Sequence, residues 1–231
     1  TDEALPLWMT TSWVHMEGRN LENILWLLRE LRKQQATRDH SSVPPLSLEL
    51  EKLIPNWMEV AALADVVFFN REFVLAAKHA SQSRNSVSNL PAELSEAATF
   101  LAETCVTLFG GPQELPATFD ALLSNATAVI GSRQLVCAWG AQGAVVLDTE
   151  GLHTQRPFPP AVVIDTIGAG DTFNGAYIAA CLQQGGSSGC ARVALRAACR
   201  VAGYKVGVRG FSLPAASSLL WATVHVGIHS L

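Results

Sequence analysis

The stretch that decides the fold is VVIDTIGAGDTFNGAYIAA, residues 162–180. It opens with a β-branched apolar run at residues 162–164, which is typical of a buried strand. After Asp171, apolar residues recur at the spacing of one helix face until Gly185 and Gly186 end the pattern. The stretch therefore predicts a strand, a tight turn and a helix. The helix face consists of Phe173, Ala176, Tyr177, Ala180 and Cys181.

Gly168, Ala169 and Gly170 lie at the predicted start of this helix. Backbone N–H groups that lack an intrahelical partner, together with the positive end of the helix dipole, attract anions there, and small residues let an anion approach closely. We interpret the turn as a site for a phosphoryl group. Asp171 is then placed to accept a proton from a hydroxyl that attacks phosphorus. An ordinary helix cap on a tight turn stays open as an alternative. A dinucleotide fingerprint fails, because Phe173 stands where its third glycine belongs.

The rest of the chain alternates between helical and extended patterns. Helices are predicted near residues 20–33 and 56–63. This alternation predicts βαβ units, an α/β fold and a mostly parallel sheet, with an antiparallel pair at 134–139 and 144–148 as its edge. Between them, residues 81–89 read as a polar linker, and helical stretches flank residues 110–112. The predicted strands cover residues 13–16, 46–50, 65–70, 134–139 and 144–148.

Composition limits the class of protein. The 231 residues are 49% apolar and 16% charged, with a net charge of −4, which indicates a chain that buries a sizeable core. The acidic balance without charge runs argues against nucleic-acid binding. The apolar tail is too short for an ordinary membrane span, so we expect no membrane partner. We expect a cytoplasmic protein whose five cysteines are reduced thiols.

Several stretches resemble one protein family. DTIGAGDTFNG, residues 165–175, resembles the C-terminal signature of the ribokinase-like (PfkB) carbohydrate kinases. The resemblance extends to the ketohexokinase, or fructose 1-kinase, branch of that family. It is carried by WVHMEGRN at 13–20, SLELEK at 47–52, ADVVFF at 64–69, LVCAWGAQGA at 135–144 and CRVAGYKVGVRGF at 199–211.

The resemblance implies a fold, a reaction and a set of site residues. It implies a three-layer α/β/α sandwich that transfers the γ-phosphoryl group of Mg-ATP to a sugar hydroxyl, converting fructose to fructose 1-phosphate. By the same resemblance, Asp171 is the catalytic base at the sugar, and Arg19 contacts nucleotide phosphate. No metal ligand is assigned, because Phe73 stands where the magnesium-associated N-x-x-E motif after Asn70 needs a glutamate. The implied anion hole is Gly168, Ala169 and Gly170, and the implied ATP loop is Gly140, Ala141, Gln142 and Gly143.

The resemblance covers residues 1–79 and 129–211. We therefore expect residues 1–231 to form one incomplete kinase domain that lacks the family's N-terminal third, including most sugar-binding residues and the lid. Residues 80–128 are predicted to be an insertion, and residues 212–231 a tail that does not match. Two alternatives stay open: an inactive nucleotide-binding fragment, and a nucleoside or other small-alcohol kinase. The resemblance also allows a homodimer, although the lid region is absent.

Four polar residues in the stretches 13–20 and 47–52 also have a structural interpretation. His15 is interpreted as a satisfied core or edge histidine of its strand. Glu17, Glu49 and Glu51 could touch nucleotide or magnesium, but solvated acids at strand ends are at least as good an interpretation.

Overall fold

The computed structural model describes residues 11–36, 44–81, 92–111, 114–187 and 189–211. The predicted tail 212–231 and most of the predicted linker 81–89 lie outside these residues. The strands are β1 (Val14–Glu17), β2 (Leu46–Leu50), β3 (Val66–Asn70), β4 (Gln134–Ala138), β5 (Ala144–Asp148) and β6 (Gly151–Gln155). The helices are α2 (Leu21–Ala36), α3 (Trp57–Ala61), α4 (Arg71–Ser81), α5 (Ala92–Phe109), α6 (Phe119–Val129), α7 (Ala169–Gln183) and α8 (Ala191–Val206), with a 3₁₀ turn, η2, at Gly140–Gln142.

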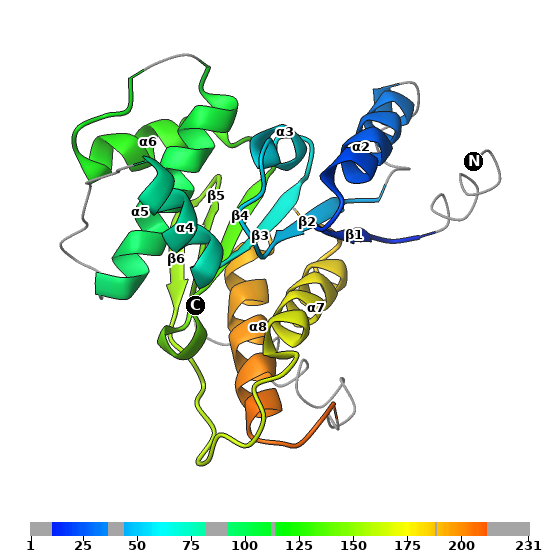
Figure 1. Ribbon diagram of the computed structural model, residues 1–231, viewed down its shortest axis with the longest axis vertical. Coiled ribbons are helices and arrows are strands. Elements are labelled where there is room, and N and C mark those ends of the chain that lie inside the picture. The colour runs from blue at the N-terminus through cyan, green and yellow to red at the C-terminus, as the bar shows by residue number, and fades with distance from the viewer. Residues whose placement is uncertain (1–10, 37–43, 82–91, 112–113, 188, 212–231) are drawn as a thin grey trace.

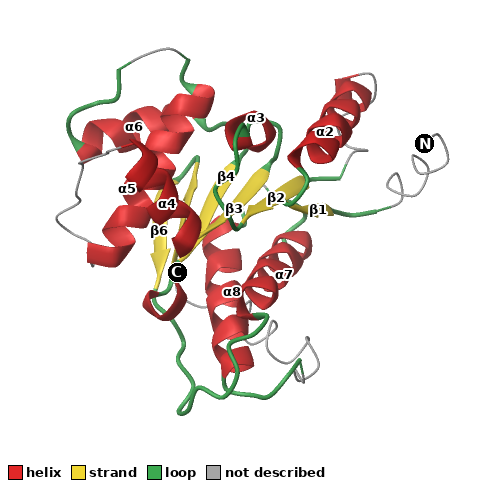
Figure 2. Ribbon diagram, in the orientation of Figure 1, coloured by secondary structure: helices red, strands yellow, loops and turns green. Residues whose placement is uncertain are grey.

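The six strands form one sheet in the order β1-β2-β3-β4-β5-β6 (Figure 2). Strands β1 to β4 pair in parallel, whereas β4–β5 and β5–β6 pair antiparallel. The predicted mostly parallel sheet with an antiparallel edge is therefore confirmed. Strand β6, which extends that edge, is not among the predicted strands.

Helices cover both faces of the sheet, which confirms the predicted three layers. Alternation along β2 shows why: Leu46, Leu48 and Leu50 face one helical layer, whereas Ser47 and Glu49 face the other. Figure 1 shows α7 and α8 side by side on one face, with α2 to α6 across the other. The residues that α7 contributes to the core include all five predicted for its apolar face.

Helices α5 and α6 take up much of the segment 80–128 that was predicted to be an insertion, and α6 ends one residue beyond it. Leu101, Cys105, Leu122 and Ala126 of these helices are all fully buried in the same core as β2. The two helices are thus an integral part of one layer, while the insertion itself stays a prediction. No helix within the described ranges combines the length and apolarity that crossing a membrane requires.

The predicted strand at residues 162–164 is wrong. Val162, Val163 and Ile164 are 67%, 62% and 55% exposed and pair with no strand among the described residues. The backbone N–H of Ile164 instead donates to the carbonyl of Val206 at 2.7 Å. The segment therefore lies against the end of α8 and not in the sheet.

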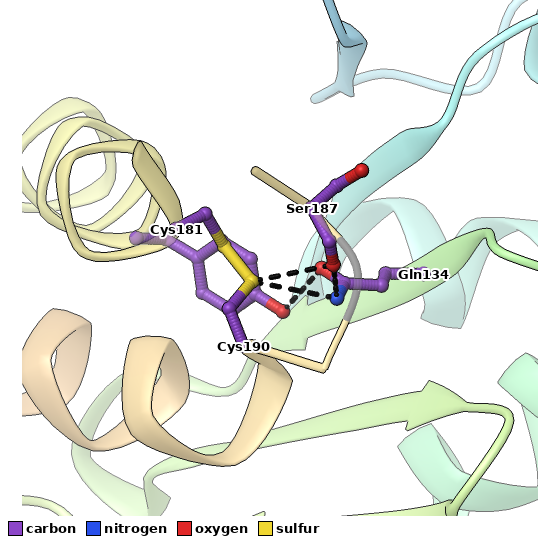
Figure 3. Close-up of a disulfide and its surroundings, with 5 residues drawn as sticks. Gln134, Cys181, Ser187 and Cys190 are labelled. Carbon is purple, nitrogen blue, oxygen red and sulfur yellow. Dashed lines mark hydrogen bonds between the residues drawn. A yellow bond between two sulfur atoms is a disulfide. The ribbon is translucent and has the colours of Figure 1, made fainter. Parts of the chain in front are cut away.

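The cysteine prediction is wrong for one pair. Cys181, in the last turn of α7, forms a disulfide with Cys190, the N-cap of α8. Figure 3 shows this bond beside Gln134, whose side-chain amide donates to the carbonyl of Ser187 at 2.5 Å. The pair meets because α7 and α8 run antiparallel and are joined by a short connection. Cys105, Cys137 and Cys199 are buried free thiols, as expected.

Candidate active site

Most of the predicted site residues gather at one edge of the sheet. The four parallel strands β1 to β4 all end there, and in such sheets ligands bind outside the carboxyl ends of the strands. Arg19 follows β1, and the predicted ATP loop 140–143 follows β4.

Helix α7 begins with a left-handed glycine. Gly168 is its N-cap, with φ 73° and ψ 12°, and a Cβ at this position would lie 2.4 Å from the ring of Phe211. Only glycine meets both conditions without strain. The Thr172 hydroxyl donates to the Gly168 carbonyl at 2.7 Å and fixes the first turn. The N–H groups of that first turn, at Gly170 and Asp171, have no acceptor within the helix and are free to meet an anion.

Asp165 anchors the segment before this turn. Its carboxylate accepts hydrogen bonds from the N–H groups of Ile167 and Gly210, each at 3.0 Å, and pairs with the Lys205 ammonium group at 3.3 Å. These groups, with the Ile167 bond the largest cause, lower the pKa of Asp165. Lys205 is fully buried and also donates to the Asp165 carbonyl at 3.0 Å. The turn at Gly168 is therefore held to the end of α8.

Asp171 lies one helical turn from the contact that seats α7 on the sheet. Asn174 is 6% exposed, and its side chain hydrogen-bonds Glu49 of β2. Glu49 pairs in register with Glu17 of β1. Because residues three apart share a helix face, Asp171 lies on the same side of α7 as Asn174 and next to these strand ends. Asp171 is exposed, as a base that receives a substrate proton must be.

Burial and like charges act on the carboxylate of Glu49. Burial is the largest cause that raises the pKa of Glu49, and Asp171, Glu17 and Glu51 raise it further. The hydrogen bond from Asn174 opposes them. Asp171 and Glu17 also act on the His15 imidazole and raise its pKa, although desolvation is the larger effect and leaves that pKa below its ordinary value. The influence of Asp171 thus reaches side chains on both β1 and β2.

Arg19 is placed by a close approach of two strand ends. The Gly18 N–H donates to the Glu49 carbonyl at 2.7 Å, and a Cβ on Gly18 would lie 2.7 Å from that oxygen. The Arg19 guanidinium pairs with the Glu17 carboxylate at 2.5 Å, with both side chains more than half exposed. The structure therefore brings the predicted phosphate ligand to the same strand end as the groups around Asp171.

The predicted ATP loop forms a separate part of the same edge. The Trp139 N–H donates to the Gly143 carbonyl at 2.8 Å and closes the turn η2. Gly143 has φ 107°, and a Cβ there would overlap the Gln155 carbonyl. Gly140, Ala141 and Gln142 are exposed. The nucleotide role of this loop stays a prediction.

The acids at this edge do not form a metal cage. Within the described part of the chain, no group of three or more histidine, cysteine, aspartate or glutamate side chains could hold a metal ion. Mg²⁺ usually binds through one or two carboxylates together with substrate phosphates rather than in an all-protein cage. These residues therefore fit Mg²⁺ that is bound with a nucleotide and not Mg²⁺ held by the protein alone.

Sequence reasoning missed two contributors to this edge. Asn174 stands inside the quoted stretch, three residues after Asp171, and that helical spacing was the signal for its position. Ser47 is a fully buried polar residue in an otherwise apolar strand, which was the signal for a hydrogen-bonded role.

Comparisons with known proteins indicate the family of the chain. Residues 105–214 match the sequence model of the pfkB family carbohydrate kinases. A ketohexokinase of Mus musculus is 31% identical over 201 residues, which is 86% of this chain and 54% of that protein. The chain thus spans about half the length of this curated relative.

Solved kinase structures share the fold. The ribokinase of Giardia lamblia has a TM-score of 0.66 and 17% identity, covering 96% of this chain and 62% of that one. The Arabidopsis thaliana ribokinase complexed with ribose and ATP has a TM-score of 0.60 and 20% identity, covering 96% and 59%. The chain belongs to the pfkB family of carbohydrate kinases and has the ribokinase-like α/β fold.

Proposed function

We propose that this chain binds ATP and transfers its γ-phosphoryl group to a sugar hydroxyl, with a ketose such as fructose as the acceptor. The observation that carries the proposal is the start of α7. An exposed carboxylate, Asp171, stands in the first turn next to the left-handed Gly168 and to N–H groups that lack an intrahelical acceptor. A base and an anion hole this close together suit transfer of a phosphoryl group to an alcohol.

Each site residue has its own role in the proposed reaction. Asp171 accepts the proton of the sugar hydroxyl, and the oxygen of that hydroxyl forms a bond to the γ-phosphorus. The bond from that phosphorus to the bridging oxygen breaks, and ADP leaves with the electron pair. The turn is formed by Gly168, Ala169 and Gly170, and the Ala169 N–H donates to the Thr166 carbonyl within it. The free N–H groups of Gly170 and Asp171 stabilise the charge on the transferred group. Mg²⁺ bound with the nucleotide would neutralise charge on its phosphates.

Arg19 and residues 140–143 hold the nucleotide in this proposal. Arg19 already meets a carboxylate of Glu17 at 2.5 Å, and a nucleotide phosphate offers the guanidinium the same kind of bidentate acceptor. Gly140 and Ala141 are small and exposed, so their backbone is accessible to the nucleotide. A cytoplasmic location and a homodimer stay predictions.

The mouse ketohexokinase relative supports a ketose acceptor. The ribokinase complexed with ribose and ATP shares only the fold, and it supports ATP as the donor without favouring one acceptor. Because the chain spans about half of the ketohexokinase, the test compares acceptors directly. It measures ATP-dependent phosphorylation of fructose, ribose and adenosine by the purified chain, with ATP binding followed by calorimetry.

Asp171→Asn tests the base, and Asp120→Asn is its matched control, since Asp120 is exposed in the first turn of α6. We expect Asp171→Asn to lower kcat by about 10²- to 10⁴-fold with little change in ATP affinity. The control keeps wild-type turnover. A large loss of ATP affinity in Asp171→Asn contradicts the base assignment. ATP binding without any turnover makes the chain a nucleotide-binding fragment, and turnover of adenosine alone makes it a nucleoside kinase.

A further inference from the structure

We propose that His15 is a pH-dependent charge partner of Asp171. Its imidazole is held from behind by Ser47 and Phe68 and shares a face of the sheet with the helix that carries Asp171. When protonated, it pairs with that carboxylate and withdraws it from proton transfer. The inference rests on the proposed function, in which Asp171 is the base.

Strand alternation places His15 on the side of the sheet that α7 covers. His15 pairs in register with Ser47, and Glu17 pairs with Glu49. Side chains two residues apart share a face, so all four point toward the layer formed by α7 and α8. Two contacts locate α7 on that face. Asn174 meets Glu49, and Tyr177 meets Phe68 edge-on with ring centroids 5.4 Å apart.

The direction of α7 then places Asp171. Tyr177 lies at the level of Phe68, whose ring also meets the His15 ring at 5.8 Å. Asn174, one turn earlier, meets Glu49 of β2, which pairs in register with Phe68 of β3. The helix therefore crosses the strands in the direction of β1, and Asp171 lies one turn further that way. The carboxylate of Asp171 thus lies on the β1 side of α7, toward Glu17 and His15, and its charge acts on the His15 ring.

Hydrogen bonds fix the imidazole from one side. The Trp13 indole N–H donates to the Ser47 hydroxyl oxygen at 2.8 Å, and the His15 Nδ1 lies 2.7 Å from the same oxygen. An indole nitrogen only donates, so Ser47 accepts from Trp13 and has its own hydrogen free for Nδ1. We assign the neutral ring its proton on Nε2 from this network. Because Nδ1 faces Ser47, Nε2 lies on the opposite side of the ring, where its N–H can meet a carboxylate.

The charges around the ring give it a response to pH. Glu17 of β1 and Asp171 of α7 face it and raise its pKa, Glu49 of β2 lies beside them, and Arg19 pairs with Glu17. Desolvation outweighs the carboxylates, so the pKa of His15 is below its ordinary value and the ring is neutral at neutral pH. A neutral ring leaves Asp171 free as a base. As pH falls, the ring takes a proton and forms an ion pair with the nearest carboxylates.

The first test is the pH profile of kcat between pH 5 and 8, where histidine titrates. His15→Asn keeps an amide near the position of Nδ1, within reach of Ser47, and loses Nε2 and the titration. We expect its acid limb to move to lower pH, so that the ratio of kcat at the two ends of this range falls by about threefold or more. The KM for ATP stays the same. His79→Asn, at an exposed position of α4, is the control and keeps the wild-type profile. An unchanged acid limb in His15→Asn overturns the proposal.

The second test does not need turnover. The His15 ring is titrated by NMR in the wild-type protein and in Asp171→Asn, with His15→Asn assigning the resonance. Loss of the Asp171 charge lowers the measured pKa of His15 if the two side chains face each other, and an unchanged pKa overturns the proposal. If the chain phosphorylates no acceptor but the pKa of His15 is lowered in Asp171→Asn, the pairing is supported and the proposed function is wrong.

Discussion

Reduction of the bond between Cys181 and Cys190 should measurably destabilise the fold. The bond joins the last turn of α7 to the N-cap of α8, and the two residues are nine positions apart. Reduction removes this cross-link and no packed atom, because both residues are fully buried and stay in the core cluster of α7 and α8. The difference between oxidised and reduced protein therefore reports the cross-link alone.

Loop-closure entropy sets the size of the effect. A cross-link over a separation of nine residues removes conformations from the unfolded chain worth roughly 2.6 kcal/mol at 25 °C. Marginal domains have a total stability of about 5–15 kcal/mol, so a loss of this size is a large fraction of the whole. We expect the free energy of unfolding to fall by about 2–3 kcal/mol on reduction.

Urea unfolding with and without dithiothreitol measures this difference. The double variant Cys181→Ala/Cys190→Ala is the control, and its unfolding midpoint does not respond to the reductant. A thiol titration of unfolded protein accompanies it. The chain has five cysteines, of which Cys105, Cys137 and Cys199 are free.

Two results would refute this reasoning. Five reactive thiols in protein that was unfolded without reductant mean that the disulfide is absent. The protein described here exposes only the thiols of Cys105, Cys137 and Cys199 under those conditions. Equal unfolding midpoints for oxidised and reduced protein, with the disulfide present, mean that the unfolded loop is already restricted and that loop entropy is not the cause.

Three further predictions concern the site and the core. Gly168→Ala, at φ +73° and against Phe211, should weaken ATP binding in calorimetry far more than Gly185→Ala, at φ +89° in open space; equal losses would contradict the anion-hole assignment. Burial raises the pKa of Glu49 in the folded protein, so the ionised carboxylate is less favourable there than in the unfolded chain. The free energy of unfolding therefore falls as pH rises from the unfolded pKa of Glu49 through its folded pKa. Glu49→Gln should therefore unfold at higher urea than wild type at neutral pH, with the advantage shrinking toward acid pH, and a pH-independent difference would exclude this cause. Phe73→Ala, at a fully buried position, should lower the free energy of unfolding by about 3–5 kcal/mol in the same experiment. A loss near zero would show that the rings of Trp57, Phe69 and Phe100, which contact Phe73, collapse into the cavity.

The elements that sequence predicted well are those with a clear period. Strand β2 alternates leucines with polar residues over residues 46–50, and its observed bounds agree with the prediction. The apolar face predicted for α7 is buried as expected. Periodicity succeeds here because each element buries one defined face, and the sequence alone determines that face.

The elements that sequence missed depend on pairing partners. Residues 162–164 have strong β propensity but lie 55–67% exposed, because their backbone bonds the end of α8 and strand formation needs a neighbouring strand as partner. Strand β6 carries a half-buried pattern without clear alternation, so it gave no such signal. The disulfide was missed for a similar reason, because it depends on how α7 and α8 pack and not on a cysteine motif.

The motif residues of the candidate site were predictable from the sequence, whereas the residues that surround them were not. The glycine turn and Asp171 follow from one stretch of sequence, because a helix N-terminus makes its own anion site. The approach of His15, Glu49 and Arg19 to that turn depends on the parallel register of β1 with β2 and on the seating of α7, which no local pattern encodes. Residues that tune the site are therefore found on the strands, while residues that define it are found in the motif.

Helix α7 links the chemistry to the stability of the fold. Its first turn carries Asp171, its second meets Glu49 through Asn174, and its last turn is tied to α8 by Cys181. A helix that is fixed at its far end and in its middle holds its first turn in place without a further contact at Asp171, which leaves that carboxylate free for a substrate. Reduction of the disulfide removes one of these two supports. If the remaining contact of Asn174 with Glu49 is enough to seat the helix, turnover of the reduced protein equals that of the oxidised protein while its stability falls, and a parallel loss of both would show that the first turn depends on the whole length of α7.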